Sequence, residues 1–203
     1  DRGTEGVSEE WKAEGHDIVH TVMDRPALPL TASTQEVSRM WGEYWKKLMS
    51  LSEAAYSVGK GTLVWDTETA LWEAFRLFKF GRQSQVRHMY TEVNAAYIED
   101  VVVPSYKHTT MSTIFLNRFK EQFVDDKWDG ESYTRAGLKS LHYEVQINME
   151  LRRKDREGQP PEFSGVVLNC RVPTKGGGPN VGGTVLPGPM SDFNTLLGMV
   201  HGG

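Results

Sequence analysis

The 203-residue sequence contains a single cysteine, Cys170, and no long apolar run. One thiol cannot form an internal disulfide or a cysteine-based zinc site, so the sequence excludes both kinds of cross-link. A transmembrane helix needs roughly 18–20 consecutive apolar residues, and because no stretch approaches that length we expect no membrane insertion. The N-terminal residues are polar and acidic, without the basic-then-apolar pattern of a secretory leader. These absences favour a virion or intracellular location.

Motifs of common enzyme chemistry are also missing. The glycine-rich residues 176–183 match neither GxxxxGK[ST] nor GxGxxG, and no serine lies in a GxSxG context. An EF-hand loop aligned on Gly130 would place Lys127 and Ala136 where calcium ligands belong, so a calcium loop is excluded. We therefore predict no cofactor and no enzymatic activity. Catalytic triads are assembled in space, so an enzyme stays open as an alternative.

The strongest metal-binding pattern lies near the N-terminus, where His16, Asp17 and His20 fall close together. On a helix, His16 and His20 would face the same way and could share a metal ion, with Asp17 as a nearby carboxylate. The segment lacks the glutamate that follows the first histidine of HExxH, and it lies in a weakly patterned region. We predict no metal site here, and a metal-dependent enzyme is the third functional alternative.

Composition divides the chain into a core and two arms. Residues 1–32 are acidic and are interrupted by glycines and prolines, which predicts an extended N-terminal arm. Residues 33–172 are predicted to form a single α+β core domain. Residues 173–203 are rich in glycine and proline and cannot bury enough surface to order themselves, which predicts a C-terminal arm that is ordered by contact with neighbouring molecules.

Hydrophobic periodicity predicts about four helices in the core. A capping box at Ser33 and Glu36 begins the first, which ends near Gly59. Asp66 or Thr67 caps the second. It either ends near Gly81 or bends there and continues into the next helix, because one glycine in a helix interior costs only about 1 kcal/mol. A third helix is expected over about residues 84–99, and the segment 101–104 terminates it. A fourth is expected over about residues 110–124, because apolar residues recur there every four positions: Met111, Phe115, Phe119 and Phe123.

Two strands are predicted after these helices. Residues 141–152 alternate strictly between apolar and polar side chains, which is typical of a half-buried strand. Residues 164–172 form its expected partner, with Cys170 on the apolar face as an unreactive core thiol. Gly158 and two prolines in residues 153–161 predict a connection longer than a tight hairpin. The fold class is thus α+β: mainly a helical bundle followed by a β-hairpin, with extended N- and C-terminal arms.

A basic stretch in the middle of the chain is the candidate binding site. Residues 74–91 contain no acidic side chain and four cations. The candidate nucleic-acid-binding residues are Arg76, Lys79, Arg82 and Arg87. Cations along one helical edge can contact phosphates, and the interleaved aromatic residues would pack inward. The net charge of −4 and the lack of a known RNA- or DNA-binding motif count against this interpretation.

The predicted function follows from the arms. Long arms that are ordered only against neighbours suit a structural subunit of a large assembly, such as a virion coat or filament protein. The expected partners are copies of the chain itself, bound through the terminal arms, with RNA or DNA as a further partner. An accessory subunit of a large hetero-complex, of the ribosomal or respiratory type, is the first alternative.

Overall fold

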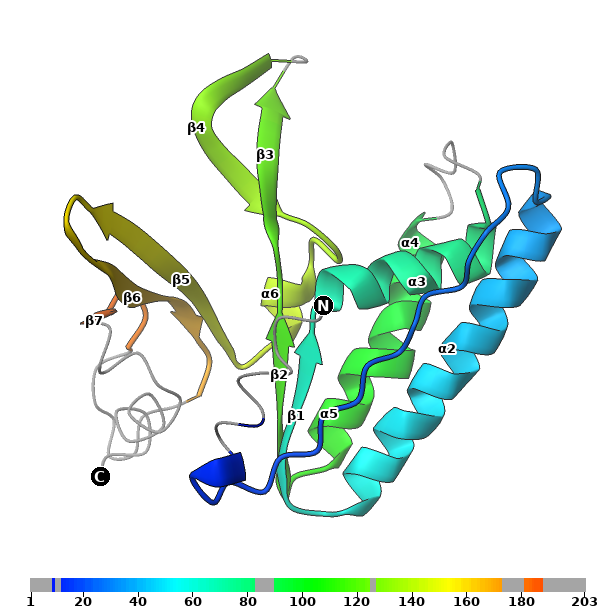
Figure 1. Ribbon diagram of the computed structural model, residues 1–203, viewed down its shortest axis with the longest axis horizontal. Coiled ribbons are helices and arrows are strands. Elements are labelled where there is room, and N and C mark those ends of the chain that lie inside the picture. The colour runs from blue at the N-terminus through cyan, green and yellow to red at the C-terminus, as the bar shows by residue number, and fades with distance from the viewer. Residues whose placement is uncertain (1–8, 10–11, 83–89, 125–126, 173–180, 188–203) are drawn as a thin grey trace. The chain divides into compact units, whose positions relative to one another are not determined.

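The computed structural model describes residues 9, 12–82, 90–124, 127–172 and 181–187. They form helices and small β-sheets, which confirms the predicted α+β class (Figure 1). The chain divides into two compact units, an N-terminal unit (Asp1–Leu138) and a C-terminal unit (Lys139–Gly203). The boundary falls within residues 33–172, which the sequence predicts as one core domain.

The longest helix, α2 (Thr34–Ser57), begins at the predicted capping box. The Ser33 hydroxyl accepts a hydrogen bond from the Glu36 N–H at 3.2 Å, and the Glu36 carboxylate accepts one from the Ser33 N–H at 2.7 Å. Donation to the Glu36 carboxylate from the Ser33 N–H, and from the Ser33 hydroxyl at 2.8 Å, lowers the pKa of Glu36. Because the first amides of a helix have no partner within it, the box stabilises this end of α2.

The strand β1 (Gly61–Asp66) leads into helix α3 (Glu68–Phe80), whose N-cap is Thr67, as predicted. The Thr67 hydroxyl accepts a hydrogen bond from the Ala70 N–H at 3.2 Å. The helix ends at Gly81, where φ is +58° and a Cβ would collide with the Thr34 carbonyl oxygen. Only glycine fits this backbone conformation and this close approach.

The predicted third helix is longer than expected. Helix α4 (Tyr90–Tyr97) continues without a break through the π-helical turn η1 (Ile98–Val102) into α5 (Val103–Lys107). The predicted stop at residues 101–104 is wrong: Pro104 lies within the helical segment, directly after the π-helical turn, where the Val103 N–H bonds to the Ile98 carbonyl five residues back. Residues 84–89 of the prediction lie outside the described residues.

The predicted fourth helix over residues 110–124 is wrong. This segment forms the strands β2 (Met111–Leu116) and β3 (Phe119–Val124). β2 pairs in parallel with β1, and β3 pairs with β4 (Lys127–Arg135) in an antiparallel hairpin. A four-residue spacing places side chains on one face of a helix, but four is also a multiple of two, so the same residues share one face of a strand.

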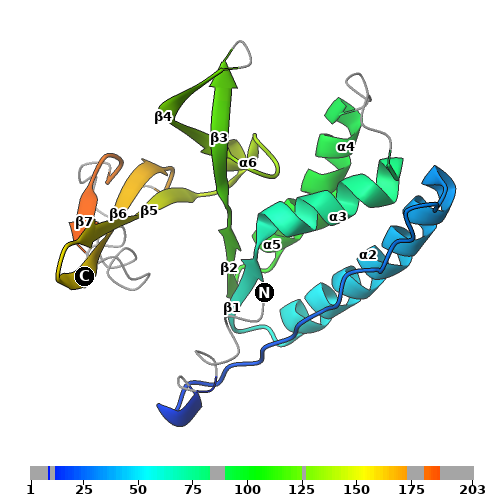
Figure 2. The same ribbon diagram turned by 45° about the horizontal axis from the view of Figure 1, so that its top comes forward.

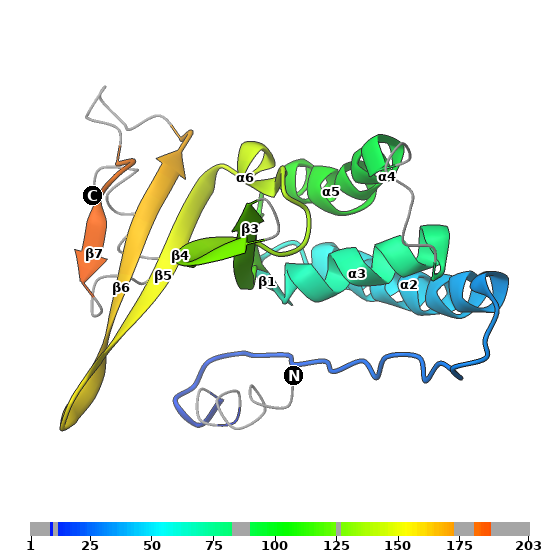
Figure 3. The same cartoon turned by 90° about the horizontal axis from the view of Figure 1, so that it is seen from above.

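Aromatic side chains form the centre of the N-terminal unit. Trp45 of α2 packs on Phe75 of α3 with ring centroids 4.8 Å apart, and Phe75 packs on Tyr97 of α4 at 5.5 Å. Trp41 and Trp45 are buried as well. Figure 3 shows α2 and α3 side by side, so this aromatic contact lies along the seam between the two helices.

The C-terminal unit begins with a short helix, α6 (Leu141–Glu144), followed by β5 (Ile147–Arg156), β6 (Gln159–Cys170) and β7 (Val185–Pro187). The three strands are antiparallel, in the order β5-β6-β7 (Figure 2). The strand predicted over residues 141–152 is confirmed from Ile147 onward, but its first residues are helical.

The predicted long connection between these strands is also wrong. Arg156 pairs directly with Gln159, so only two residues form the turn. Gly158 has a φ of +67° there, and tight hairpin turns favour such backbone angles.

The core of the C-terminal unit is small. Among the described residues, Val167, Cys170, Val181 and Leu186 form a buried cluster, and Met149 packs against it. Cys170 is a buried thiol, as predicted.

Residues 16–29 of the N-terminal arm form neither helix nor strand, whereas the C-terminal arm lies outside the described residues except for 181–187. Among the helices that the structure describes, none has both the length and the apolar character to cross a membrane.

Candidate nucleic-acid interface

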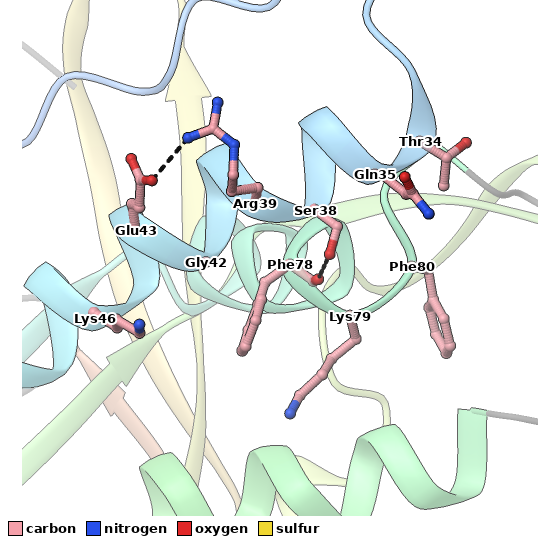
Figure 4. Close-up of a pocket in the computed structure, with 10 residues that line it drawn as sticks. All are labelled: Thr34, Gln35, Ser38, Arg39, Gly42, Glu43, Lys46, Phe78, Lys79 and Phe80. Carbon is pink, nitrogen blue, oxygen red and sulfur yellow. Dashed lines mark hydrogen bonds and ion pairs between the residues drawn. The ribbon is translucent and has the colours of Figure 1, made fainter.

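A groove runs between α2 and α3 in the N-terminal unit (Figure 4). Two close contacts between the helices lie among its lining residues. The Ser38 hydroxyl donates a hydrogen bond to the Phe78 carbonyl at 2.5 Å, and a Cβ on Gly42 would lie 3.0 Å from Cδ2 of the Phe78 ring. Glycine at position 42 therefore lets the aromatic ring of α3 lie directly on α2.

The rims of the groove carry more positive than negative charge. Arg39, Glu43 and Lys46 come from α2, and Lys79 comes from α3 on the opposite side (Figure 4). Arg39 pairs with Glu43 at 2.9 Å, although both side chains remain mostly exposed. Lys79 places its ammonium group 4.7 Å from the centre of the Phe78 ring. The groove has a volume of about 560 Å³.

This arrangement can bind an anion. The exposed cations of both helices provide electrostatic attraction, and the Phe78 ring, which also lines the groove, provides an apolar surface. Such a combination is typical of surfaces that contact a phosphate backbone and an aromatic base. The exposed Arg39–Glu43 pair is open to exchange, because surface ion pairs contribute only about 0–1 kcal/mol.

Of the four cations predicted from the sequence, Lys79 is the one that the structure places in the groove. Arg76 binds its neighbour Glu73 through two hydrogen bonds, at 2.5 and 3.0 Å, and these bonds raise the pKa of Arg76. Arg82 donates to the carbonyl oxygens of Leu30 and Pro29, at 2.5 and 2.6 Å. It thus fixes the end of the N-terminal arm. Arg87 lies outside the described residues.

No protein-family model matches the chain, and a search of curated proteins finds no match.

The sequence analysis missed the cations that α2 contributes. Arg39 and Lys46 are seven residues apart, which is two turns of a helix, so a helical projection of α2 places them on one face. The projection does not show which other element packs next to that face. Only the packing of α3 against α2 brings Lys79 to the same groove.

The histidines of the N-terminal arm do not form the arrangement considered for a metal ion. His16 and His20 lie on residues that are neither helical nor strand-like, so the shared helical face is absent. His16 lies 3.8 Å from the Glu14 carboxylate and is exposed. Within the described part of the chain, no group of three or more His, Cys, Asp or Glu side chains is arranged to hold a metal ion.

A second polar site, unlike the groove, is fully enclosed. Glu68, the first residue of α3, has no exposed surface. One carboxyl oxygen accepts a hydrogen bond from the Leu138 N–H at 3.4 Å. The other oxygen and the nearby Tyr97 hydroxyl are both buried without a well-formed hydrogen bond. Burial raises the pKa of Glu68 to about 7, although Tyr97, the Leu138 amide and Arg135 act in the opposite direction.

The surroundings of Glu68 explain its enclosure. A Cβ on Gly137 would collide with the carboxyl group, so a glycine is required for the chain to cover it. Burial also raises the pKa of Tyr97 well above its ordinary value, with the Glu68 charge as the next cause. Nothing in the sequence pattern distinguishes Glu68 from an ordinary acidic residue in the first turn of a helix, where such residues are common.

Proposed function

We propose that the protein is a structural subunit of a large assembly, of the virion coat or filament type, in which copies of the chain bind one another. The observation that carries this proposal is the small size of the sheets. In the described residues, β1–β2 and β3–β4 are two-stranded and β5–β6–β7 is three-stranded. Two-stranded sheets are marginally stable by themselves, and an open strand edge is a template for pairing with another chain.

Exposed apolar side chains support the same proposal. Phe119 and Tyr133 are diagonal neighbours on one face of the β3–β4 hairpin, and they are 51% and 55% exposed. Val19 and Leu30 of the N-terminal arm are 89% and 93% exposed. Burial of such groups against a neighbouring molecule is favourable by about 25 cal/mol for each Å² removed from water.

Light scattering on the purified chain tests the proposal. We expect particles far larger than the 22.9 kDa chain. The double substitution Phe119→Ser and Tyr133→Ser should shift the population toward small species. Leu51→Ser, at an exposed position of α2 outside the sheets, is the matched control and should leave the particle size unchanged. A wild-type chain that remains monomeric or dimeric would contradict the proposal and favour an accessory subunit of a hetero-complex.

A second function, contact with RNA or DNA, is favoured by the groove between α2 and α3. The lining of the groove includes the cations Arg39, Lys46 and Lys79 together with the Phe78 ring, and cations with an aromatic ring suit a phosphate backbone with a stacked base. Each lysine that neutralises a phosphate contributes roughly 0.7–0.9 to the slope of log K against log salt. We therefore expect Lys46→Ala with Lys79→Ala to weaken binding and reduce the slope by about 1.4–1.8.

The control for this measurement is Lys120→Ala, because Lys120 is exposed on β3, outside the groove. It removes one charge without touching α2 or α3. The absorbance ratio at 260 and 280 nm, read across the light-scattering peak, shows whether nucleic acid accompanies the particle. Equal salt slopes for the wild type and the double variant would reject the groove as the binding site.

A further inference from the structure

The outer edge of β5 carries backbone groups that no strand of the described residues pairs with. On the other side of the sheet, the Val167 N–H bonds to the Thr184 carbonyl at 3.0 Å, and the Val167 carbonyl accepts from the Gly183 N–H at 2.6 Å. The peptide groups of Val167 thus point away from β5. Because backbone groups alternate between the two sides along a strand, those of Val166 and Ser164 point toward β5.

This alternation fixes the directions in β5 as well. Val166 is opposite Glu150 and Ser164 is opposite Arg152, so the peptide groups of Glu150 and Arg152 point toward β6. The peptide groups of the alternate residues point outward, away from β6. These residues are Met149, Leu151 and Arg153. Leu151 lies at the centre of this outward set.

The two faces of the sheet differ near this edge: one carries apolar side chains next to Arg153, and the other carries charged side chains. Leu151 and Phe163 lie on the same face as Met149 and are 63% and 52% exposed. Glu150 and Arg152 lie on the opposite face, where they form an ion pair at 2.8 Å. The edge therefore offers apolar contact, opposite charges and backbone hydrogen-bonding groups that no described strand uses.

We infer that β5 pairs antiparallel with β5 of a second copy of the chain, centred on Leu151. This inference rests on the proposed function and names one interface of the assembly. When two identical strands pair antiparallel about a two-fold axis, facing side chains lie on the same face of the sheet only if one residue lies opposite its own copy. That residue is the centre of the pair. A centre at Glu150, Arg152 or Arg153 would place like charges directly opposite each other, which is destabilising.

The centre at Leu151 avoids this repulsion. It places Leu151 opposite its own copy, and on the other face it places Glu150 opposite Arg152 of the second copy, twice by symmetry. Because the peptide groups of Leu151 point outward, the central pair can exchange both of its hydrogen bonds. The result is one continuous sheet in the order β7-β6-β5-β5-β6-β7, and a two-fold interface of this kind closes on itself.

Disulfide trapping in the full chain tests the register. In the proposed pair the Leu151 Cα atoms are about 5.5 Å apart, within the range of about 4.4–6.8 Å that a disulfide allows. Leu151→Cys should form a covalent dimer under mild oxidation. Lys154→Cys is the matched control on the same exposed strand. In the proposed pair, Lys154 of one copy faces residue 148 of the other, so the two cysteines at position 154 would be six residues, or roughly 20 Å, apart. Cys170 is buried, so the wild type gives the background.

Exchange of the charges at positions 150 and 152 is a second test of the same pair. It is made in the Leu151→Cys variant, and the yield of covalent dimer is measured. Glu150→Arg or Arg152→Glu alone would place like charges across the interface and should lower the yield of covalent dimer several-fold. The double variant Glu150→Arg with Arg152→Glu restores opposite charges and should restore the yield. Equal trapping at positions 151 and 154, or a double variant no better than the single ones, would overturn the inference.

Light scattering on the same preparations separates this inference from the proposed function. Large particles without trapping at Leu151→Cys would mean that the chain assembles but not through β5. A trapped dimer without larger particles would mean that β5 pairs as inferred, whereas the large assembly does not form. Circular dichroism of each variant confirms that the fold is retained.

Discussion

Replacement of the buried Glu68 by glutamine should change how stability depends on pH. The pKa of Glu68 is raised from 4.5 to about 7, mainly because burial disfavours its charged form. Each pKa unit corresponds to about 1.36 kcal/mol, so ionisation in the folded state costs about 3 kcal/mol relative to the unfolded chain. Glutamine has nearly the same shape and no charge to bury.

The sign of the effect follows from linkage. Below pH 4.5 the carboxyl is protonated in both states and ionisation costs nothing. As the pH rises toward 7, the unfolded chain loses its proton first, so the folded state becomes less stable. The wild type should thus lose up to about 3 kcal/mol between pH 4.5 and 8. Glu68→Gln should lack this loss and be the more stable protein at pH 8.

Urea unfolding at pH 5 and pH 8, followed by tryptophan fluorescence, measures the change. Trp72 reports on this region because its ring lies 5.1 Å from that of Tyr97, beside the buried carboxyl. Glu53→Gln, at an exposed position of α2, controls for the change in net charge and should keep the wild-type pH dependence. If the wild type and Glu68→Gln lose stability equally between the two pH values, the buried carboxyl is not the cause and the reasoning fails.

Three further substitutions test the fold. Ser33→Ala removes the capping hydroxyl of α2 and should lower the free energy of unfolding by about 1 kcal/mol, as measured by urea denaturation. Gly81→Ala places a Cβ against the Thr34 carbonyl at a φ of +58° and should lower the free energy of unfolding by about 1–3 kcal/mol in the same assay. An unchanged free energy of unfolding would mean that the end of α3 tolerates a side chain. Val167→Ala, at a fully buried position of β6, should destabilise the C-terminal unit by about 1–3 kcal/mol. Hydrogen exchange should then be faster at the backbone amides of β5 and β6. Unchanged exchange would show that this small core does not stabilise the sheet.

The helix starts could be predicted because their signals are local. The box formed by Ser33 and Glu36, and the cap at Thr67, each need only residues within one turn. Gly81 likewise ends α3 because of its own backbone conformation.

The segment from Met111 to Val124 shows where local pattern fails. Its apolar residues satisfy the spacing of a helix and of a strand equally well. What decides between them is a partner distant in sequence: β2 pairs with β1 from Gly61 to Asp66, and no property of residues 110–124 specifies that strand. The same holds for residues 141–144, which alternate like a strand but form a helical turn.

The candidate site divides in the same way. The charge of Lys79 and the shared helical face of Arg39 and Lys46 are properties of the sequence. Only the close packing of Phe78 on Gly42 places the three cations around one groove.

Glu68 is the clearest case of a property that the sequence leaves open. Its position at the start of α3 follows from the Thr67 cap, but its burial depends on Tyr97, Gly137 and Leu138. These residues come from segments far along the chain, and their approach replaces water around the carboxyl. The sequence thus determined which groups can ionise, and the tertiary structure decided at what pH they do so.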